Sequence, residues 1–369
     1  MPYKKKTVVT THPSTDRERK NLLFLTLITS KGSISRTDLS NLTDINIVTV
    51  SNYINNYLKK SLVLERGYDI SSGGRRPELI EMNKRWGYVV GIHIDQNKIR
   101  GVISNLGMEI LESKTITREK KDLNPIIVDF IKKLQNAQNG EPGEIKRINI
   151  CYSENKENST KDKLGEVLGV PILIASDALC AAFGEKTSNS YAKEVPTVLY
   201  IYKDTGEGIL IKNGELYQAN DAELKKSYLR KWGPKISIVA EAKRMVKNGV
   251  GTSIIDMTGG KPEDITDEII IKAAKEEDEV TRDLIRTSGM NLGVRVAYLI
   301  NSFEPETVII GGGIEEAGDL FMKPFTSSIK RFIRQKISDR VKVVPAVLGR
   351  EACVKGSAFL AIREAFIEG

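Results

Sequence analysis

The residues best suited to specific recognition in the first part of the chain lie between positions 47 and 60. If this stretch forms a helix, its outer side carries Val48, Asn52, Asn56 and Lys59, flanked by Thr49 and Asn55. An Asn amide can pair bidentately with adenine in the major groove, and Val or Thr methyl groups can contact the methyl group of thymine. The pattern therefore indicates base recognition in duplex DNA.

The elements that must position these side chains form a three-helix pattern. The expected helices cover residues 17–30, 36–41 and 47–60, with a turn over 43–46 between the last two. Two short helices joined by a tight turn are typical of a helix-turn-helix, whose second helix enters the major groove. The apolar inner side of that second helix would pack on the other two.

Ser35 and Arg36 stand where the first of the two short helices begins. Ser35 is the expected N-cap of this helix, and both residues are candidate DNA contacts. The pattern of residues 62–69 predicts the two strands and the tip of a wing. With this wing, residues 16–70 form an expected winged helix-turn-helix domain. A three-helix protein-interaction module is the alternative reading of the same pattern.

The net charge is concentrated in the same region. Residues 1–85 contain 15 Lys and Arg against 8 Asp and Glu, which accounts for +7 of the chain's +8. A positive field at one end of a chain is typical of a nucleic-acid-binding module. Residues 1–15 read as a disordered basic tail, and the alternative is that they only aid solubility. Removing Lys4, Lys5 and Lys6 still leaves +4, so the tail explains only part of the excess.

A glycine-rich linker is expected over residues 71–86. It contains Arg75 and Arg76 next to Gly73 and Gly74. Paired arginines on a flexible segment can enter the narrow minor groove of A·T-rich DNA, where the negative potential is deepest. The alternative is a plain interdomain connection, and the two readings are compatible.

The rest of the chain, residues 87–369, predicts a two-lobed α/β domain. Three strands in a meander open lobe one, at about 87–190, and strands alternating with helices follow. Lobe two, at about 191–369, repeats the alternation and contains a long amphipathic helix over 278–301. Two similar α/β halves in one chain suggest a cleft between the lobes.

Composition excludes several classes of protein. The chain has three cysteines far apart and two histidines, too few for a conventional zinc site or a disulfide framework. No apolar stretch approaches the roughly 20 residues that span a bilayer, and the first residues lack the apolar core of a signal peptide. We therefore expect a cytoplasmic protein with no membrane partner and no metal cofactor.

Several motifs together resemble the ROK family of bacterial repressors, open reading frames and sugar kinases. The motifs that carry the resemblance are Ser33-Ile-Ser-Arg-Thr-Asp-Leu39, Thr49-Val-Ser51, Gly73-Gly-Arg-Arg-Pro77, Leu292-Gly-Val-Arg-Val-Ala-Tyr-Leu-Ile-Asn301, Pro305-Glu-Thr-Val-Ile-Ile-Gly-Gly-Gly313 and Leu348-Gly-Arg-Glu-Ala352. The resemblance implies an actin-like, hexokinase-like two-lobed domain, sugar-responsive DNA binding, and homodimers or tetramers. The winged helix places the chain with the regulators of the family rather than with its stand-alone kinases.

The sequence departs from the family where a kinase needs its phosphate loops. The first phosphate turn of the family is matched to residues 95–98, which have no glycine, and the second to residues 204–208, which include Asp204 and Glu207. Carboxylates there would repel a polyanion, and the missing glycines would keep backbone away from it. The family's zinc motif of one His and three Cys is absent around 225–260. We therefore expect no zinc and no enzyme activity.

Two residues match the family's ligand pocket. Asp177 matches the Asp that acts as a base in the kinases and holds a sugar hydroxyl in sensors. The competing reading is structural, because Ser176 or Asp177 is well placed to cap the following helix. Glu223 corresponds to a pocket Glu, although Lys226 stands where the family has a His.

These expectations combine into one function. The chain is expected to be a repressor of carbohydrate-related genes whose dimer places two recognition helices on an A·T-rich, near-palindromic operator. A sugar or sugar derivative bound by the ROK domain would shift DNA affinity by binding the two states unequally. The alternatives are a sugar kinase with a fused DNA-binding head and an effector-independent regulator.

Overall fold

A computed structural model describes residues 13–68, 78–118, 123–137, 144–152, 164–193, 195–203, 207–216 and 237–369. The chain divides into two compact units, each of which is described by itself. The first unit comprises residues 1–180 together with 354–369, and the second comprises residues 181–353. In the parts of the chain that the model describes, no helix is both long and apolar enough to cross a membrane.

The first unit begins with a small head of three helices and a three-stranded sheet. Its elements are α1 (Asp16–Lys31), β1 (Ser33–Ser35), α2 (Arg36–Thr43), α3 (Ile47–Lys59), β2 (Val63–Tyr68) and β3 (Glu78–Met82). The strands lie in the order β1-β3-β2 and are all antiparallel. The three helices and their bounds agree with the expected helix-turn-helix within one or two residues.

Local capping explains where the head's helices start and stop. Thr15 and Glu18 form a capping box at the start of α1, and Gly32, at a φ of 76°, ends that helix. The Ser35 hydroxyl accepts the backbone N–H of Asp38 at 3.0 Å, which starts α2 as expected. The Asn46 side chain accepts the N–H of Val48 at 2.7 Å and starts α3.

The wing is longer than the sequence indicated. Both of its strands were expected within residues 62–69, but the partner of β2 is β3, which lies inside the expected linker over 71–86. Val63 pairs with Met82, and Glu65 pairs with Ile80. The head therefore extends to Met82. The rest of the expected linker up to residue 77, with Arg75 and Arg76, lies outside the described residues.

A five-stranded mixed sheet forms the body of the first unit, in the order β6-β5-β4-β7-β8. Its strands are β4 (Tyr88–Ile94), β5 (Lys98–Ser104), β6 (Ile110–Thr117), β7 (Ile145–Tyr152) and β8 (Ile172–Ser176). Strands β4, β5 and β6 are the expected antiparallel meander, whereas β7 runs parallel to β4 and to β8.

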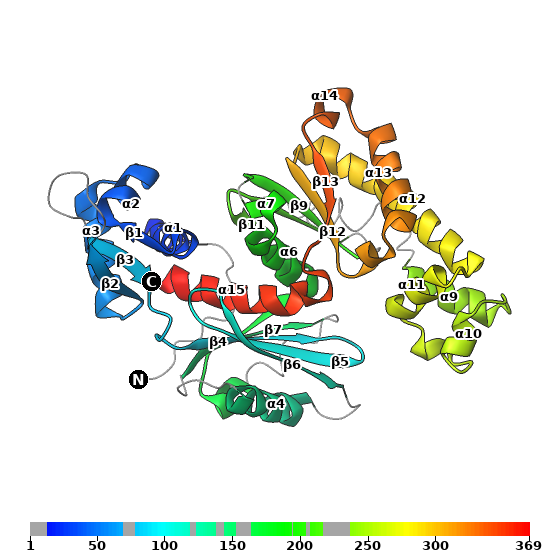
Figure 1. The fold of residues 1–369 in the computed structure, drawn as a ribbon, viewed down its shortest axis with the longest axis horizontal. Helices are drawn as coiled ribbons and strands as arrows, with labels where there is room; N and C mark the ends of the chain where they lie inside the picture. The colour runs from blue at the N-terminus through cyan, green and yellow to red at the C-terminus, as the bar shows by residue number, and fades with distance from the viewer. Residues whose placement is uncertain are drawn as a thin grey trace. The chain divides into compact units, whose positions relative to one another are not determined.

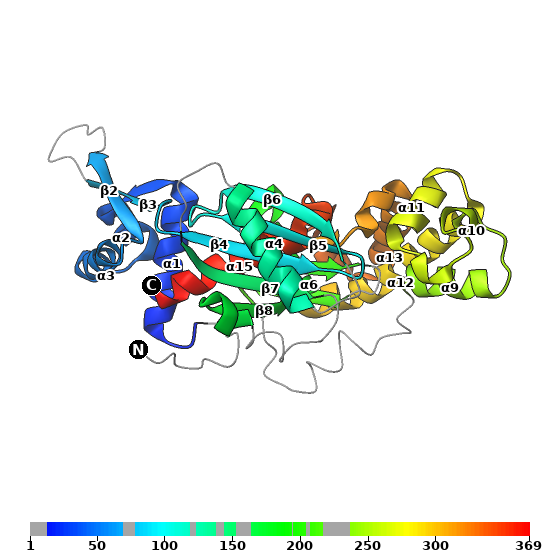
Figure 2. The same ribbon diagram turned by 90° about the horizontal axis from the view of Figure 1, so that it is seen from below.

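Helices cover both faces of this sheet, with α4 (Leu123–Ala137) on one face and α15 (Ala352–Glu368) on the other (Figures 1 and 2). Close approach requires glycine on each side. A Cβ at Gly101 would lie 2.5 Å from the Phe130 ring of α4, and one at Gly91 would lie 2.5 Å from the Ala358 backbone of α15.

The head and the sheet share one apolar core through α15. Its buried members include Leu25 and Ile54 of the head, Val89 of β4, and Ile362 and Phe366 of α15. A buried polar bridge crosses the same contact between the head and α15. The Tyr57 hydroxyl donates to Asn21 Oδ1 at 2.9 Å, and Asn21 Nδ2 donates to the carbonyl of Ile367 at 3.2 Å. This packing places residues 354–369 in the first unit, although the sequence analysis assigned them to lobe two.

The second unit contains another five-stranded sheet, in the order β11-β10-β9-β12-β13. Its strands are β9 (Thr197–Tyr202), β10 (Glu207–Lys212), β11 (Glu215–Leu216), β12 (Thr307–Gly311) and β13 (Lys342–Pro345). Its principal helices are α9 (Ile238–Lys247), α11 (Asp267–Lys275), α12 (Glu279–Phe303) and α13 (Asp319–Phe332).

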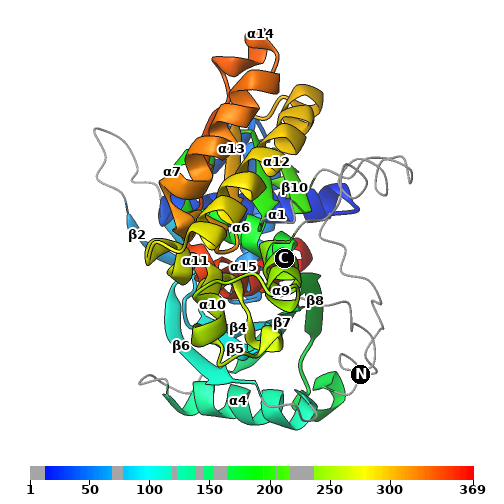
Figure 3. The same cartoon turned by 90° about the vertical axis from the view of Figure 1, so that its right-hand side faces the viewer.

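Helices α12 and α13 lie side by side, as Figure 3 shows. Gly289 and Gly293 of α12 make this contact possible, because Cβ atoms there would lie 2.8 Å and 2.4 Å from the carbonyl oxygens of Phe321 and Phe325. The expected long helix is therefore present, and its small residues serve helix packing.

Candidate nucleic-acid interface and effector site

The outer face of α3 presents the side chains that the sequence singled out. Val48, Asn52, Asn55 and Lys59 are exposed, and Thr49 and Asn56 are partly exposed. The opposite face is anchored in the core of the head, because Val50, Ile54 and Tyr57 have no exposed surface. A well-packed helix therefore carries a row of unburied amide, apolar and basic groups, which suits insertion into a DNA groove.

Ser35 and Arg36 make contacts inside the head. Ser35 is buried, accepts the Asp38 N–H, and lies 2.6 Å from an Asp38 carboxylate oxygen. Arg36 donates to Glu65 on β2 at 2.6 Å and to Glu78 on β3 at 3.1 Å. Arg36 therefore ties the start of α2 to both strands of the wing.

Asp177 is the first residue of α6 (Asp177–Ser188), and its carboxylate faces His93 of β4. Asp177 Oδ2 lies 3.4 Å from His93 Nε2, and the two residues are only 4% and 5% exposed. The expected helix cap is supplied by the neighbouring residue, since Ser176 Oγ accepts the N–H of Leu179 at 3.3 Å. Of the two capping candidates, Ser176 is thus the one that caps α6.

Arg100 of β5 lies on the other side of the His93 ring. Its NH1 group is 3.5 Å from His93 Nδ1 and donates to Asp95 Oδ2 at 2.5 Å. A guanidinium group can only donate, so a hydrogen bond between these two groups would use Nδ1 as the acceptor nitrogen of a neutral imidazole. The remaining proton would then be on Nε2, which faces Asp177. Sequence reasoning missed His93 and Arg100, although a polar residue inside each of two apolar strands was a usable signal.

The turn over residues 95–98 is occupied by its own carboxylate. Asp95 Oδ1 accepts the backbone N–H groups of Asn97 at 2.8 Å and Lys98 at 2.6 Å. Burial opposes ionisation, but these bonds and the bond from Arg100 hold the pKa of Asp95 below its ordinary value. The backbone N–H groups of this turn are therefore bound by its own carboxylate.

A similar arrangement occurs in the second unit, at the glycine run 311–313. The N–H of Gly313 donates to Glu315 Oε2 at 2.8 Å. Burial, together with the nearby carboxylates of Glu316 and Glu185, raises the pKa of Glu315 to about 7. Glu185 itself accepts the N–H groups of Val347 and Leu348 at 3.1 and 2.7 Å. These backbone donors, too, are bound to the protein's own carboxylates.

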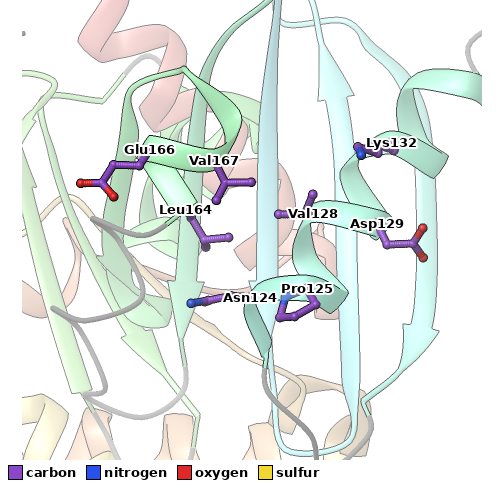
Figure 4. A pocket seen from close by; sticks show the side chains of 8 residues that line it. All are labelled: Asn124, Pro125, Val128, Asp129, Lys132, Leu164, Glu166 and Val167. Atoms are coloured by element: carbon purple, nitrogen blue, oxygen red, sulfur yellow. The ribbon is translucent and has the colours of Figure 1, made fainter.

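A pocket of about 580 Å³ lies in the first unit beside α4 (Figure 4). It is lined by Asn124, Pro125, Val128, Asp129, Lys132, Leu164, Glu166 and Val167. None of the residues expected to bind DNA or an effector takes part in it.

Two groups of predicted site residues lie outside the described residues. Arg75 and Arg76 fall within residues 69–77, and Glu223 falls within residues 217–236. Their expected contacts with the minor groove and with an effector therefore stay predictions. The expectation that the chain needs no zinc stays a prediction as well.

Two known repressors are similar to this chain over about nine-tenths of its length. The xylose repressor of Bacillus subtilis is 28% identical over 370 residues, covering 92% of this chain and 94% of the repressor. The xylose repressor of Caldicellulosiruptor bescii is 29% identical, covering 89% of this chain and 92% of its own.

A solved structure has the same fold over nearly the same length. It is described as a ROK family transcriptional regulator, a homologue of the Escherichia coli Mlc protein. It is 19% identical with a TM-score of 0.72, and the match covers 96% of this chain and 99% of that one. The model of the ROK family matches residues 89–364, which is most of the chain. The chain belongs to the ROK family.

Proposed function

We propose that the protein is a DNA-binding transcriptional repressor of sugar-related genes. The observation that carries the proposal is the exposed row of Val48, Asn52, Asn55 and Lys59 on a helix whose other face is fully packed. The similarity to xylose repressors over about nine-tenths of the chain supports the same function. The concentration of positive charge in residues 1–85 would attract DNA phosphates.

The test begins with the full-length protein and a random-sequence duplex library. Selection should enrich one A·T-rich, near-palindromic site, and binding to it should weaken steeply as salt rises. Asn52→Ala and Asn55→Ala should each lower the preference for the selected site by about ten-fold, within the range for lost amide–base pairs. Asn291→Ala, an exposed Asn on α12, is the matched control and should leave DNA affinity unchanged. Failure to enrich any sequence would overturn the proposal.

The same proposal includes an assembly with two heads. A near-palindromic site requires two copies of α3, so we expect a homodimer or tetramer in solution. Light scattering coupled to size-exclusion chromatography measures this directly. Arg75→Ala with Arg76→Ala should weaken binding to the selected site, and unchanged affinity across a salt series would remove these residues from the interface.

The effector part of the proposal centres on Asp177 and His93. Their buried carboxylate and imidazole are suited to recognising a ligand hydroxyl, and Glu223 is the second acidic candidate. A thermal-shift screen with sugars, including xylose, and with sugar phosphates should give a hit that Asp177→Asn abolishes while DNA binding persists. If no sugar shifts the melting temperature, the effector-independent regulator is the better description.

The turns at residues 95–98 and 311–315 argue against the kinase alternative. Phosphoryl transfer depends on positioning and stabilising a polyanion, and Asp95 and Glu315 already accept the backbone N–H groups that would do so. We expect no turnover when the protein is incubated with ATP and a panel of hexoses and pentoses. Measurable ADP release that depends on one sugar would reverse this conclusion.

A further inference from the structure

Val48 is an exposed apolar side chain in the first turn of the helix expected to enter DNA. It is 65% exposed, among the highest values of the large apolar side chains that the model describes. Leaving it in water has a free-energy cost that the fold does not recover, since no packing of the head depends on it. Single exposed apolar side chains are common on protein surfaces, so what distinguishes Val48 is its place in the first turn of the helix expected to enter DNA.

The surroundings of Val48 specify what that surface must offer. Asn52 lies one turn further along the same face, and Asn55 and Lys59 continue the row. A side chain with two methyl groups and no donor or acceptor can only make apolar contacts. In the major groove, the apolar group on the edge of an unmodified base pair is the C5-methyl group of thymine.

At this end of α3, the neighbouring residues Ser35 and Arg36 are engaged in contacts within the head. The base contacts here are therefore expected from α3 itself. Arg36 is held by Glu65 and Glu78, and Ser35 is buried as the cap of α2. Recognition helices contact base edges with their first residues, and Val48 is the second residue of α3. Val48 is thus placed where a base edge is expected.

The distance between Val48 and Asn52 along α3 allows a second contacted base to be assigned. Val48 and Asn52 are four residues apart, which is about 6 Å along the axis of an α-helix. This is close to the rise of two base pairs, at about 3.4 Å each. A thymine contacted by Val48 and an adenine paired with Asn52 would therefore fall within about two base pairs of each other.

We propose that Val48 selects a thymine in each half of the operator through its C5-methyl group, and that Asn52 reads an adenine within two base pairs of it. This rests on the proposed function, because it assigns base preferences to the same DNA-binding face. The net charge of +7 over residues 1–85 and the basic end of the row at Lys59 favour DNA over a protein partner as the occupant.

The experiment removes one methyl group from the DNA without changing its hydrogen-bonding edges. The probe is the tightest duplex selected by this protein, synthesised with deoxyuridine in place of each thymidine in turn. Full-length wild type should lose about four-fold in affinity at one thymine of each half-site, the value of one buried methyl-sized group. Val48→Ala should bind the thymine and uracil duplexes equally, whereas Val48→Ile should keep the difference.

Asn52 is tested on the same duplex with 7-deazaadenine, which lacks the N7 acceptor. Wild type should lose affinity at one adenine, and Asn52→Ala should be insensitive to that change while still distinguishing thymine from uracil. Val347→Ala, which alters another exposed valine at 60% exposure, is the control and should behave as wild type. Variants at exposed positions should fold normally, and their melting curves check this.

Two results would overturn the inference and leave the proposed function standing. The first is wild-type protein that binds the selected duplex over a scrambled one yet ignores every uracil substitution. The second is Val48→Ala discriminating between thymine and uracil as well as wild type does. Failure of the protein to select any duplex would overturn both. In that case Val48, with the exposed Leu42 and Ile47 at the same turn, would belong to a protein-binding surface.

Discussion

His93 Nε2 and Asp177 Oδ2 lie 3.4 Å apart inside the first unit, where a strand and the first turn of a helix bring them together. Arg100 lies on the other side of the His93 ring, with its NH1 group facing Nδ1. Since guanidinium nitrogen atoms do not accept hydrogen bonds, a hydrogen bond from Arg100 to the neutral ring would leave the ring proton on the side of Asp177. The carboxylate of Asp177 would then face the ring N–H, and the tautomer of His93 is a measurable property of the site.

Arg100→Gln should allow both tautomers of the neutral His93 ring. An amide can accept as well as donate, so His93 should become a mixture of tautomers, whereas wild type should have the Nε2–H form alone. Nitrogen-15 spectra of histidine-labelled protein measure this, and a His12→Gln background leaves His93 as the only histidine. Arg118→Gln is the control, because Arg118 donates to the Asp95 carbonyl and not to the ring. A single unchanged tautomer in Arg100→Gln would contradict the assignment.

Ser176→Ala should destabilise the start of α6, because Ser176 Oγ accepts the Leu179 N–H. The expected cost is about 1 kcal/mol, the usual value of an N-cap. Hydrogen exchange at the Leu179 amide should be faster in Ser176→Ala and nearly unchanged in Asp177→Asn. The reverse order would make Asp177 the cap and remove the reason for assigning its carboxylate to a ligand.

The head was largely predictable because its signals are local. Ser35 and Asn46 cap their helices, Gly32 ends α1, and the apolar positions of α3 follow a helical period. Strand β3 was missed because it follows a Gly-rich stretch and a proline, which read as a linker. Its pairing with β2 and β1 is a tertiary property that the local pattern does not contain.

The candidate effector site was only half predictable. Asp177 could be found from its motif, but the choice between Ser176 and Asp177 as the cap depends on hydrogen-bond geometry. His93 was not singled out from the sequence, although it is a polar residue inside an apolar strand. Its neighbour Arg100 is seven positions away in sequence and reaches it only through the register of β4 and β5, in which the two residues are paired.

Asn21→Ala should loosen the head from α15. Asn21 accepts from the Tyr57 hydroxyl and donates to the Ile367 carbonyl, and all of these groups are buried. Removing the amide leaves both partners unsatisfied, at a cost of roughly 2–4 kcal/mol. Hydrogen exchange of α1 and α3 should rise together. Tyr57→Phe deletes one bond and should have a smaller effect, and Ser30→Ala at the exposed end of α1 is the control.

The stability of the second unit should depend on pH through Glu315. Its pKa is raised from 4.5 to about 7 by burial and by the carboxylates of Glu316 and Glu185. The folded state therefore binds a proton more tightly than the unfolded state, so the stabilisation is complete below about pH 4.5 and is lost as pH rises through 7, by on the order of 3 kcal/mol. The Gly313 amide, which donates to Glu315, should exchange faster at pH 8 than at pH 6 after correction for the intrinsic rate. Glu315→Gln should remove this excess, because its amide is neutral at every pH. Glu276→Gln, at the exposed C-cap of α11, should retain it. An identical pH profile in wild type and Glu315→Gln would show that another group controls the stability of this turn.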